Sequence, residues 1–248
     1  MMILTSNPNK KGNKNNKIIA ALIVGIIAVS ILIAVMIPVP KANFHNIAVK
    51  PTEQQKEIVA SLGERAERVR NKMVDSSVDN MLLITNDGRK LALDQRLTNE
   101  MLPDDPNSKV SVCANNVYDI WERTTPQKST QLIFCDLSTP HNDGKFNVYD
   151  DIRNKLIAKG IPESEIAYIH NADSEAKKKE LFSKVRSGQV RVLLGSTAKM
   201  GAGTNVQKKL IAIHHTDCPW RPADVGRILR TFKIKKNVEV TDNGKIII

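Results

Sequence analysis

QLIFC (residues 131–135), IAYI (166–169), VRVLL (190–194) and LIAI (210–213) are four short apolar stretches spaced along the second half of the chain. A helix-forming segment at 148–157, closed by Gly160, and a lysine-rich one at 174–187, closed by Gly188, separate the first three. Short apolar strands that alternate with helices are typical of a parallel sheet covered by helices on both faces. The sequence therefore predicts an α/β fold, and ligands of such folds collect beyond the carboxyl ends of the strands.

The preceding region, residues 38–125, is predicted to be helical. Thr52 and Gln55 form a capping-box pattern at a helix start, and apolar residues then recur at helical spacing to about residue 73. Ser108 is the expected cap of a further helix, whereas Asn86-Asp87-Gly88 predicts a turn. The last segment, 231–248, predicts a hairpin around Asn243-Gly244.

The N-terminal segment predicts a membrane anchor. A basic tail at residues 1–17 precedes an unbroken apolar run, IIAALIVGIIAVSILIAVMI, from Ile18 to Ile37. In helical form this run spans about 30 Å, which is the thickness of a bilayer core. The alternatives are a buried helix of a soluble protein and a cleaved signal peptide. A retained transmembrane helix is favoured because the run is long and carries no polar stripe.

The expected localisation is a single-pass membrane protein with two conflicting indications of sidedness. Four lysines precede the apolar run, at positions 10, 11, 14 and 17, and only Lys41 and Lys50 follow it closely. The positive-inside rule would hold the N-terminus in the cytoplasm and send the rest outward. The chemistry of the soluble part favours a cytoplasmic position instead.

Composition sets weak limits on function. The chain has 248 residues, 37 Lys and Arg, 26 Asp and Glu and a formal net charge of +11. A basic chain suits a polyanion partner, but an ordinary solvated surface explains the same numbers equally well. The three cysteines show no metal-ligand spacing, and the adjacent His214 and His215 would point to opposite faces of a strand. No metal site is predicted.

Three segments at the expected strand ends carry candidate chemistry. The loop GSTAKMGAGTN (195–205) combines small residues with hydroxyl groups, which suits close approach to phosphate, although a tight bend explains it as well. It is not a Walker A loop, because GxxxxGK[ST] occurs nowhere in the chain. Arg227 and Arg230 share a helix face and could clamp a phosphoryl group, with an exposed basic helix as the alternative.

The order of these pieces resembles a known family. QLIFCDLSTP, then IAYIHNADSEAKKKELFSKVRSGQVRVLLGSTAKMGAGTNVQ, then PWRPAD and GRILR are similar to the second, RecA-like lobe of Swi/Snf-like superfamily-two helicases. The likeness is greatest to the methylase-helicase proteins of conjugative elements and phages, and it extends from about residue 38 to 230. It implies a RecA-like lobe at 126–230 that binds nucleic acid, most simply DNA.

The resemblance also implies residue roles. Residues 131–140 correspond to motif IV, residues 195–207 to motif V, and Arg227 and Arg230 to the motif VI arginine fingers. The implied nucleic-acid contacts are Ser138, Thr139, Ser196, Thr197 and Lys199. The implied nucleotide contacts are Gly201, Gly203, Thr204 and Asn205.

Two departures from the family bear on catalysis. The chain has no first lobe with its Walker A lysine and acidic magnesium holders, so ATP and magnesium are expected only if such a lobe is supplied in trans. Motif VI has also lost about four residues, or about 6 Å of helix, before Arg227. We therefore expect the isolated chain not to hydrolyse ATP. The alternatives are a membrane-anchored, non-catalytic binding module and the relic of a rearranged mobile-element helicase gene.

Overall fold

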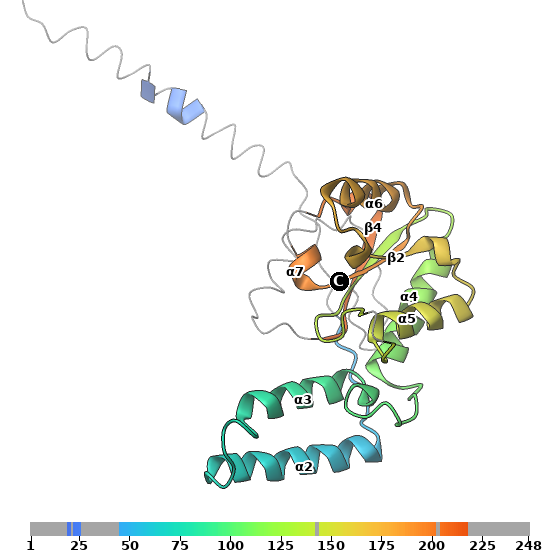
Figure 1. Cartoon of the computed structure of the whole chain (residues 1–248). Coiled ribbons are helices and arrows are strands. Elements are labelled where there is room, and N and C mark those ends of the chain that lie inside the picture. Colours follow the sequence, from blue (N-terminus) through green and yellow to red (C-terminus); the bar gives the residue numbers. More distant parts are fainter. Residues whose placement is uncertain (1–18, 21, 26–44, 142–143, 202–203, 218–248) are drawn as a thin grey trace, which may run out of the picture. The chain divides into compact units, whose positions relative to one another are not determined.

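The computed structural model describes residues 19–20, 22–25, 45–141, 144–201 and 204–217, and it divides the chain into two units, Met1–Pro40 and Lys41–Ile248 (Figure 1). The helices of the second unit are α2 (Glu53–Arg70), α3 (Met81–Leu93), α4 (Lys109–Arg123), α5 (Val148–Ala158), α6 (Glu175–Ser187) and α7 (Thr197–Met200). Its strands are β1 (Thr130–Phe134), β2 (Ile166–Tyr168), β3 (Val192–Gly195) and β4 (Leu210–His215). Four 3-10 turns, η1 (Gln95–Leu97), η2 (Glu163–Glu165), η3 (Ile169–Asn171) and η4 (Gln207–Lys209), connect them.

The four strands form one parallel sheet in the order β2-β3-β1-β4. Alternate residues of β1, β2 and β3 enter opposite cores, as the two-residue period of a strand requires. Ile133 of β1 joins the core that α4 and α5 cover, whereas Leu132 and Phe134 join the core on the other face, which includes Val185 of α6. The predicted α/β class and parallel sheet are thereby confirmed, and the arrangement is consistent with a RecA-like lobe.

A two-helix hairpin precedes the sheet (Figure 1). The predicted capping box is present: Oγ1 of Thr52 accepts the Gln55 amide, and the Gln55 side chain accepts the Thr52 amide. Helix α2 buries none of its residues, and Arg65 ties it to α3 through Asp79 and Asp87. The hairpin is therefore held to itself mainly by polar contacts.

The turn predicted at Asn86-Asp87-Gly88 is wrong. These residues lie inside α3, which begins when the Asn80 side chain accepts the amides of Leu82 and Leu83. Gly88 faces α2, where a methyl group on its Cα would make an ordinary contact with Leu62 at 3.7 Å. Helix packing thus overrides a local turn signal, as tertiary contacts often do.

The predicted transmembrane helix from Ile18 to Ile37, and with it the single-pass membrane localisation, is corrected. Among the described residues, no helix is long and apolar enough to cross a bilayer. Residues 19–20 and 22–25 of the predicted span are described, and they are helical. The rest of that span lies outside the described residues, as does the hairpin predicted at Asn243-Gly244.

Gly188 closes α6 in a left-handed conformation (φ 81°) and also approaches another segment closely. A methyl group on its Cα would stand 2.6 Å from the carbonyl oxygen of Lys128, just before β1. Gly160 closes α5 with φ 105° but has open space around it. A side chain at either position would therefore strain the backbone, but only a side chain at position 188 would also clash with a neighbouring segment.

We expect Gly188→Ala to lower the free energy of unfolding by about 2–4 kcal/mol, since strain and overpacking add. Gly160→Ala is the matched control and should cost only about 1–2 kcal/mol, from strain alone. Urea unfolding followed by circular dichroism measures both. Equal losses would show that the close approach of Gly188 to Lys128 has no energetic weight.

Candidate nucleic-acid interface

The loops that resemble motifs IV and V are neighbours at the carboxyl edge of the sheet. Strands β1 and β3 pair in parallel, with Phe134 opposite Gly195. The Cys135 amide continues the pairing by donating to the Gly195 carbonyl at 3.1 Å. Residues after 134 and after 195 therefore leave the sheet side by side, which brings Ser138 and Thr139 to the same edge as Ser196, Thr197 and Lys199.

Two acidic side chains fix the ends of three strands relative to one another. The amides of Asp136 and Leu137 donate to Oδ2 of Asp217, after β4, at 2.9 and 2.8 Å. The Thr197 amide, after β3, donates to Oδ1 of Asp136 at 2.6 Å. Burial raises the pKa of Asp217 in spite of these amide bonds. Both carboxylates thus accept hydrogen bonds from the backbone amides of the loops at this edge.

Three of the residues predicted to contact nucleic acid are buried and support the local backbone structure. Oγ of Ser138 accepts the Val148 amide at the start of α5, at 2.9 Å. Oγ of Ser196 caps α7 by accepting the Lys199 amide at 3.3 Å, and Thr197 is buried. These residues shape the edge, and they offer little side-chain surface to a ligand.

The accessible part of this edge carries groups that can be positively charged. Lys199 is exposed, and Thr139, half-buried, lies with its hydroxyl 3.4 Å from Nε2 of the exposed His141. His170, directly after β2, packs its ring edge-on against Tyr149, and its buried Nδ1 has no hydrogen-bond partner among the described residues. Burial lowers the pKa of His170, and the nearby Lys199 and His141 lower it further.

His141 and His170 were not predicted from the sequence. His170 could have been found from the sequence, because His170 directly follows the strand predicted at 166–169 and ligands of such folds bind beyond the carboxyl ends of the strands. His141 belongs to the loop after β1 and has no comparable signal. Lys199 supplies the positive charge at this edge, and the two imidazole rings add polar groups suited to phosphate oxygens.

The predicted nucleotide contacts are dispersed. Gly201 and Thr204 are buried, and the Thr204 hydroxyl donates to the Met200 carbonyl at 3.0 Å. Asn205 is exposed beside the last turn of α6, where its carbonyl accepts from Arg186 at 2.8 Å. Gly203, Arg227 and Arg230 lie outside the described residues.

His214 and His215 lie on opposite faces of β4, as the strand period predicts. Nε2 of His214 is 2.9 Å from Oε1 of Gln131, whereas His215 stacks on Phe134 at 5.1 Å between ring centroids. Both ring nitrogens of His215 are buried without a hydrogen-bond partner among the described residues. Burial lowers the pKa of His214 to about 3 and that of His215 to about 4, so both rings are neutral at physiological pH.

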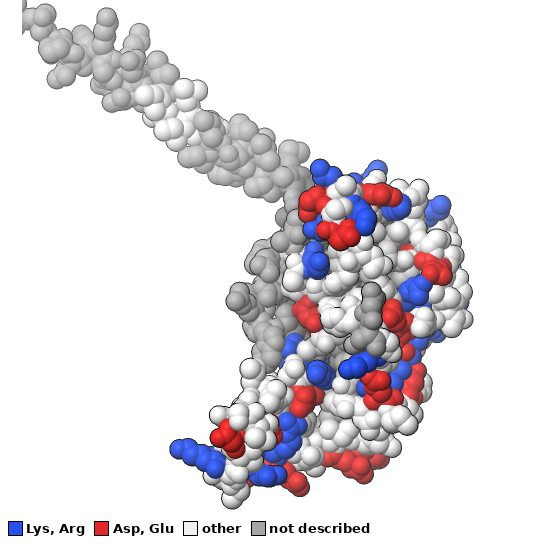
Figure 2. All heavy atoms as spheres, in the orientation of Figure 1, with Lys and Arg blue, Asp and Glu red and all other residues white. Residues whose placement is uncertain are grey.

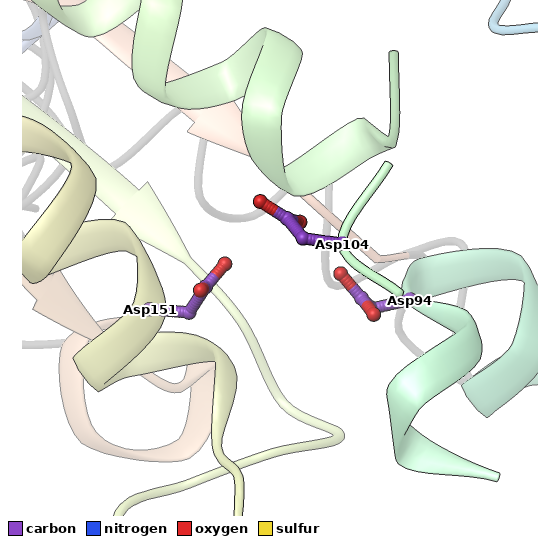
Figure 3. A group of neighbouring side chains, drawn as sticks. All are labelled: Asp94, Asp104 and Asp151. Carbon is purple, nitrogen blue, oxygen red and sulfur yellow. The ribbon is translucent and has the colours of Figure 1, made fainter. Parts of the chain in front are cut away.

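Three carboxylates, those of Asp94, Asp104 and Asp151, converge next to α5 (Figure 3). Their geometry resembles a cation site, but Arg96 already fills the cationic role. Its Nη2 lies 2.7 Å from Asp94, 2.9 Å from Asp104 and 2.9 Å from Asp151. Nζ of Lys155 lies 2.5 Å from Asp104 and 3.0 Å from Asp151. The cluster is therefore an ion-pair network that joins the end of α3 to α5.

Charges of both signs are interspersed over the face of the molecule shown in Figure 2. Net charge therefore does not single out an interface on that face, and local arrangement has to do so. The chain matches no protein-family model and no curated protein.

Arg96→Met is expected to lower the free energy of unfolding by about 3–5 kcal/mol, because it leaves the buried Asp94 carboxylate without its cation. The side chains of Arg96 and Asp94 are only 11% and 2% exposed. Arg153→Met, which breaks the more exposed pair with Glu163, is the control and should cost at most about 1 kcal/mol. Chemical denaturation provides the comparison, and similar losses for the two variants would contradict the role given to the network.

His215 makes the stability of the fold depend on pH. Its folded-state pKa lies below the ordinary 6.5, so its contribution is complete above about pH 6.5 and is lost as pH falls toward 4. His215→Phe keeps a ring on Phe134 and removes the titration. The stability difference in favour of the variant should grow as pH falls, to on the order of 2–3 kcal/mol at pH 4. Denaturation curves at a series of pH values test this, and parallel profiles would refute it.

Proposed function

We propose that this chain is a nucleic-acid-binding lobe of the helicase type, which contacts the sugar–phosphate backbone of DNA through the carboxyl edge of its sheet. One observation carries the proposal. The two loops that resemble motifs IV and V follow adjacent parallel strands, β1 and β3, and open onto the same edge. Their resemblance to these motifs concerns sequence, and their adjacency is a separate, spatial property that a helicase lobe requires.

The chemistry of the edge supports binding more than catalysis. Lys199 and Thr139 offer a charge and a hydroxyl, and His141 and His170 add donors that are suited to phosphate. The nearby carboxylates of Asp136 and Asp217 are occupied by backbone amides. Because these 248 residues contain no Walker A lysine, ATP turnover would depend on phosphate- and magnesium-holding residues outside them.

Equilibrium binding of labelled single- and double-stranded DNA across a salt series tests the proposal. Lys199→Gln should reduce the slope of log K against log salt by about 0.7–0.9, as expected for one lost phosphate contact. Lys199 is exposed, so the variant should fold normally. Lys177→Gln is the matched control, since Lys177 is equally exposed but paired with Asp173.

The expected result is binding that weakens with salt, depends on Lys199 and occurs without ATP hydrolysis above background. Lys199→Arg should restore much of the affinity, because it keeps the charge. A folded chain that fails to bind DNA at low salt would overturn the proposal. Steady ATP hydrolysis by the purified chain would overturn its second part.

A further inference from the structure

A second basic surface lies at the opposite, amino edge of the sheet. Three segments lead into β1, β3 and β4 there: residues 124–129, 186–191 and 205–209. They contain no Asp or Glu. Four of their basic residues define what we call the basic edge: Lys128, Arg186, Lys208 and Lys209.

Contacts between the three segments make the basic edge continuous. Nζ of Lys209 donates to the Gln127 carbonyl at 3.3 Å. Gly188 approaches so closely that a methyl group there would stand 2.8 Å from Cβ of Lys128 and 3.1 Å from Nζ of Lys209. Nη1 of Arg186 donates to the Asn205 carbonyl at 2.8 Å. These contacts bring the segments of Lys128, Arg186 and Lys209 together although they are up to 81 residues apart, and Lys208 adjoins Lys209 in the chain.

The charges of the basic edge are not neutralised within the part of the chain that the structure describes, where none of the four residues forms a salt bridge. Neighbouring lysines of α6 behave differently: Lys177, Lys178 and Lys184 pair with Asp173, Glu175 and Glu180. The acidic turn η2 lies toward β2, where Glu165 faces the buried Arg191 at 3.8 Å. Positive charge thus remains over β3, β1 and β4.

Lys128 has an unusual backbone conformation. Its φ of 50° is left-handed, a conformation in which glycine or asparagine is usual. The lysine in this strained position is exposed, and both it and Lys209 lie against Gly188. Strained residues of this kind gather at functional sites, because local stability alone would favour another residue.

We propose that the basic edge binds a nucleic-acid backbone, as a contact separate from that of the carboxyl edge. The choice of nucleic acid as the polyanion rests on the proposed function. Five residues of β1 separate the two edges, about 16 Å at 3.3 Å per residue, so each edge meets a different stretch of backbone.

The shape and composition of the basic edge fit a backbone better than a lipid surface. Strands β3, β1 and β4 are neighbours at a spacing of about 4.8 Å, which makes the edge about 10 Å wide. A ridge of that width suits a single phosphate strand. Surface-binding membrane segments also insert large apolar side chains, and the three described segments have none among their exposed residues.

The test uses the full chain and a labelled DNA duplex over a salt series. The triple variant K128G/K208Q/K209Q removes three charges of the basic edge. The control K177Q/K178Q/K179Q removes three lysines of α6, and so produces the same change in net charge. We expect the first variant to reduce the slope of log K against log salt by about 2–3 and to weaken binding at low salt by about tenfold or more. The control should stay within about twofold of the wild type.

Lys128→Gly separates binding from folding. Glycine relieves the positive φ, so the single variant should melt no lower than the wild type while binding DNA more weakly. A loss of affinity at an unchanged melting temperature supports the proposal. If K128G/K208Q/K209Q binds like the wild type, or if the control weakens binding equally, the basic edge is not a specific contact and the proposal is overturned.

Two further arms distinguish failure of the basic edge from failure of the proposed function. If Lys199→Gln weakens binding and K128G/K208Q/K209Q does not, the carboxyl edge binds DNA and the basic edge does not. If the wild type binds no DNA but binds phosphatidylserine vesicles through Lys128, Lys208 and Lys209, both proposals are overturned and the surface is a lipid contact.

Discussion

The carboxylates of Asp136 and Asp217 hold together the edge on which the candidate interface depends. Asp217 accepts two amides from the loop after β1, and Asp136 accepts one from the loop after β3. Three strand ends are thereby fixed in relation to one another by charge-assisted hydrogen bonds, which are stronger than neutral ones. Because these hydrogen bonds hold the first residues of both loops in place, the positions of Thr139 and Lys199 beyond the sheet are constrained. The cost is the burial of Asp217, and its raised pKa reflects that cost.

A similar logic joins the helical hairpin to the lobe. Arg96 lies just after α3 and reaches carboxylates on both sides, at Asp94 and at Asp151 of α5. Thr52 and Gln55, at the start of α2, bond to Gln95 and to the Leu91 carbonyl. The hairpin is thus attached at its base through polar groups and through Leu93 of α3, which joins the core beneath α4 and α5. The two cores of the sheet, by contrast, are apolar and close around β1 and β3.

The sequence predicted the strands and helices of the lobe well, since their apolar residues repeat with the periods that burial imposes. It also predicted the caps at Thr52 and Ser108, where the signal lies within three residues. It failed at Asn86-Asp87-Gly88, because the packing of α3 on α2 is not local. For the candidate site, the sequence predicted that the polar residues follow the carboxyl ends of the strands. It did not predict that Ser138 and Ser196 accept hydrogen bonds from the backbone at the starts of α5 and α7. Nor did it predict the pairing of Asp217 with the loop after β1, since those residues are 80 and 81 positions apart.

The weak burial of α2 has a consequence for how the molecule opens. No residue of α2 is buried, and Val59, Met73, Val78 and Leu82 of the hairpin region are mostly exposed. Few buried apolar groups would be exposed if α2 came away while the sheet stayed intact, whereas α3 buries Ile84, Leu91 and Leu93. Helix α2 should therefore open locally at a low free-energy cost, so that its amides exchange with solvent, whereas the amides of β1 and β3 exchange only on global unfolding. The molecule thus has two levels of stability along one chain.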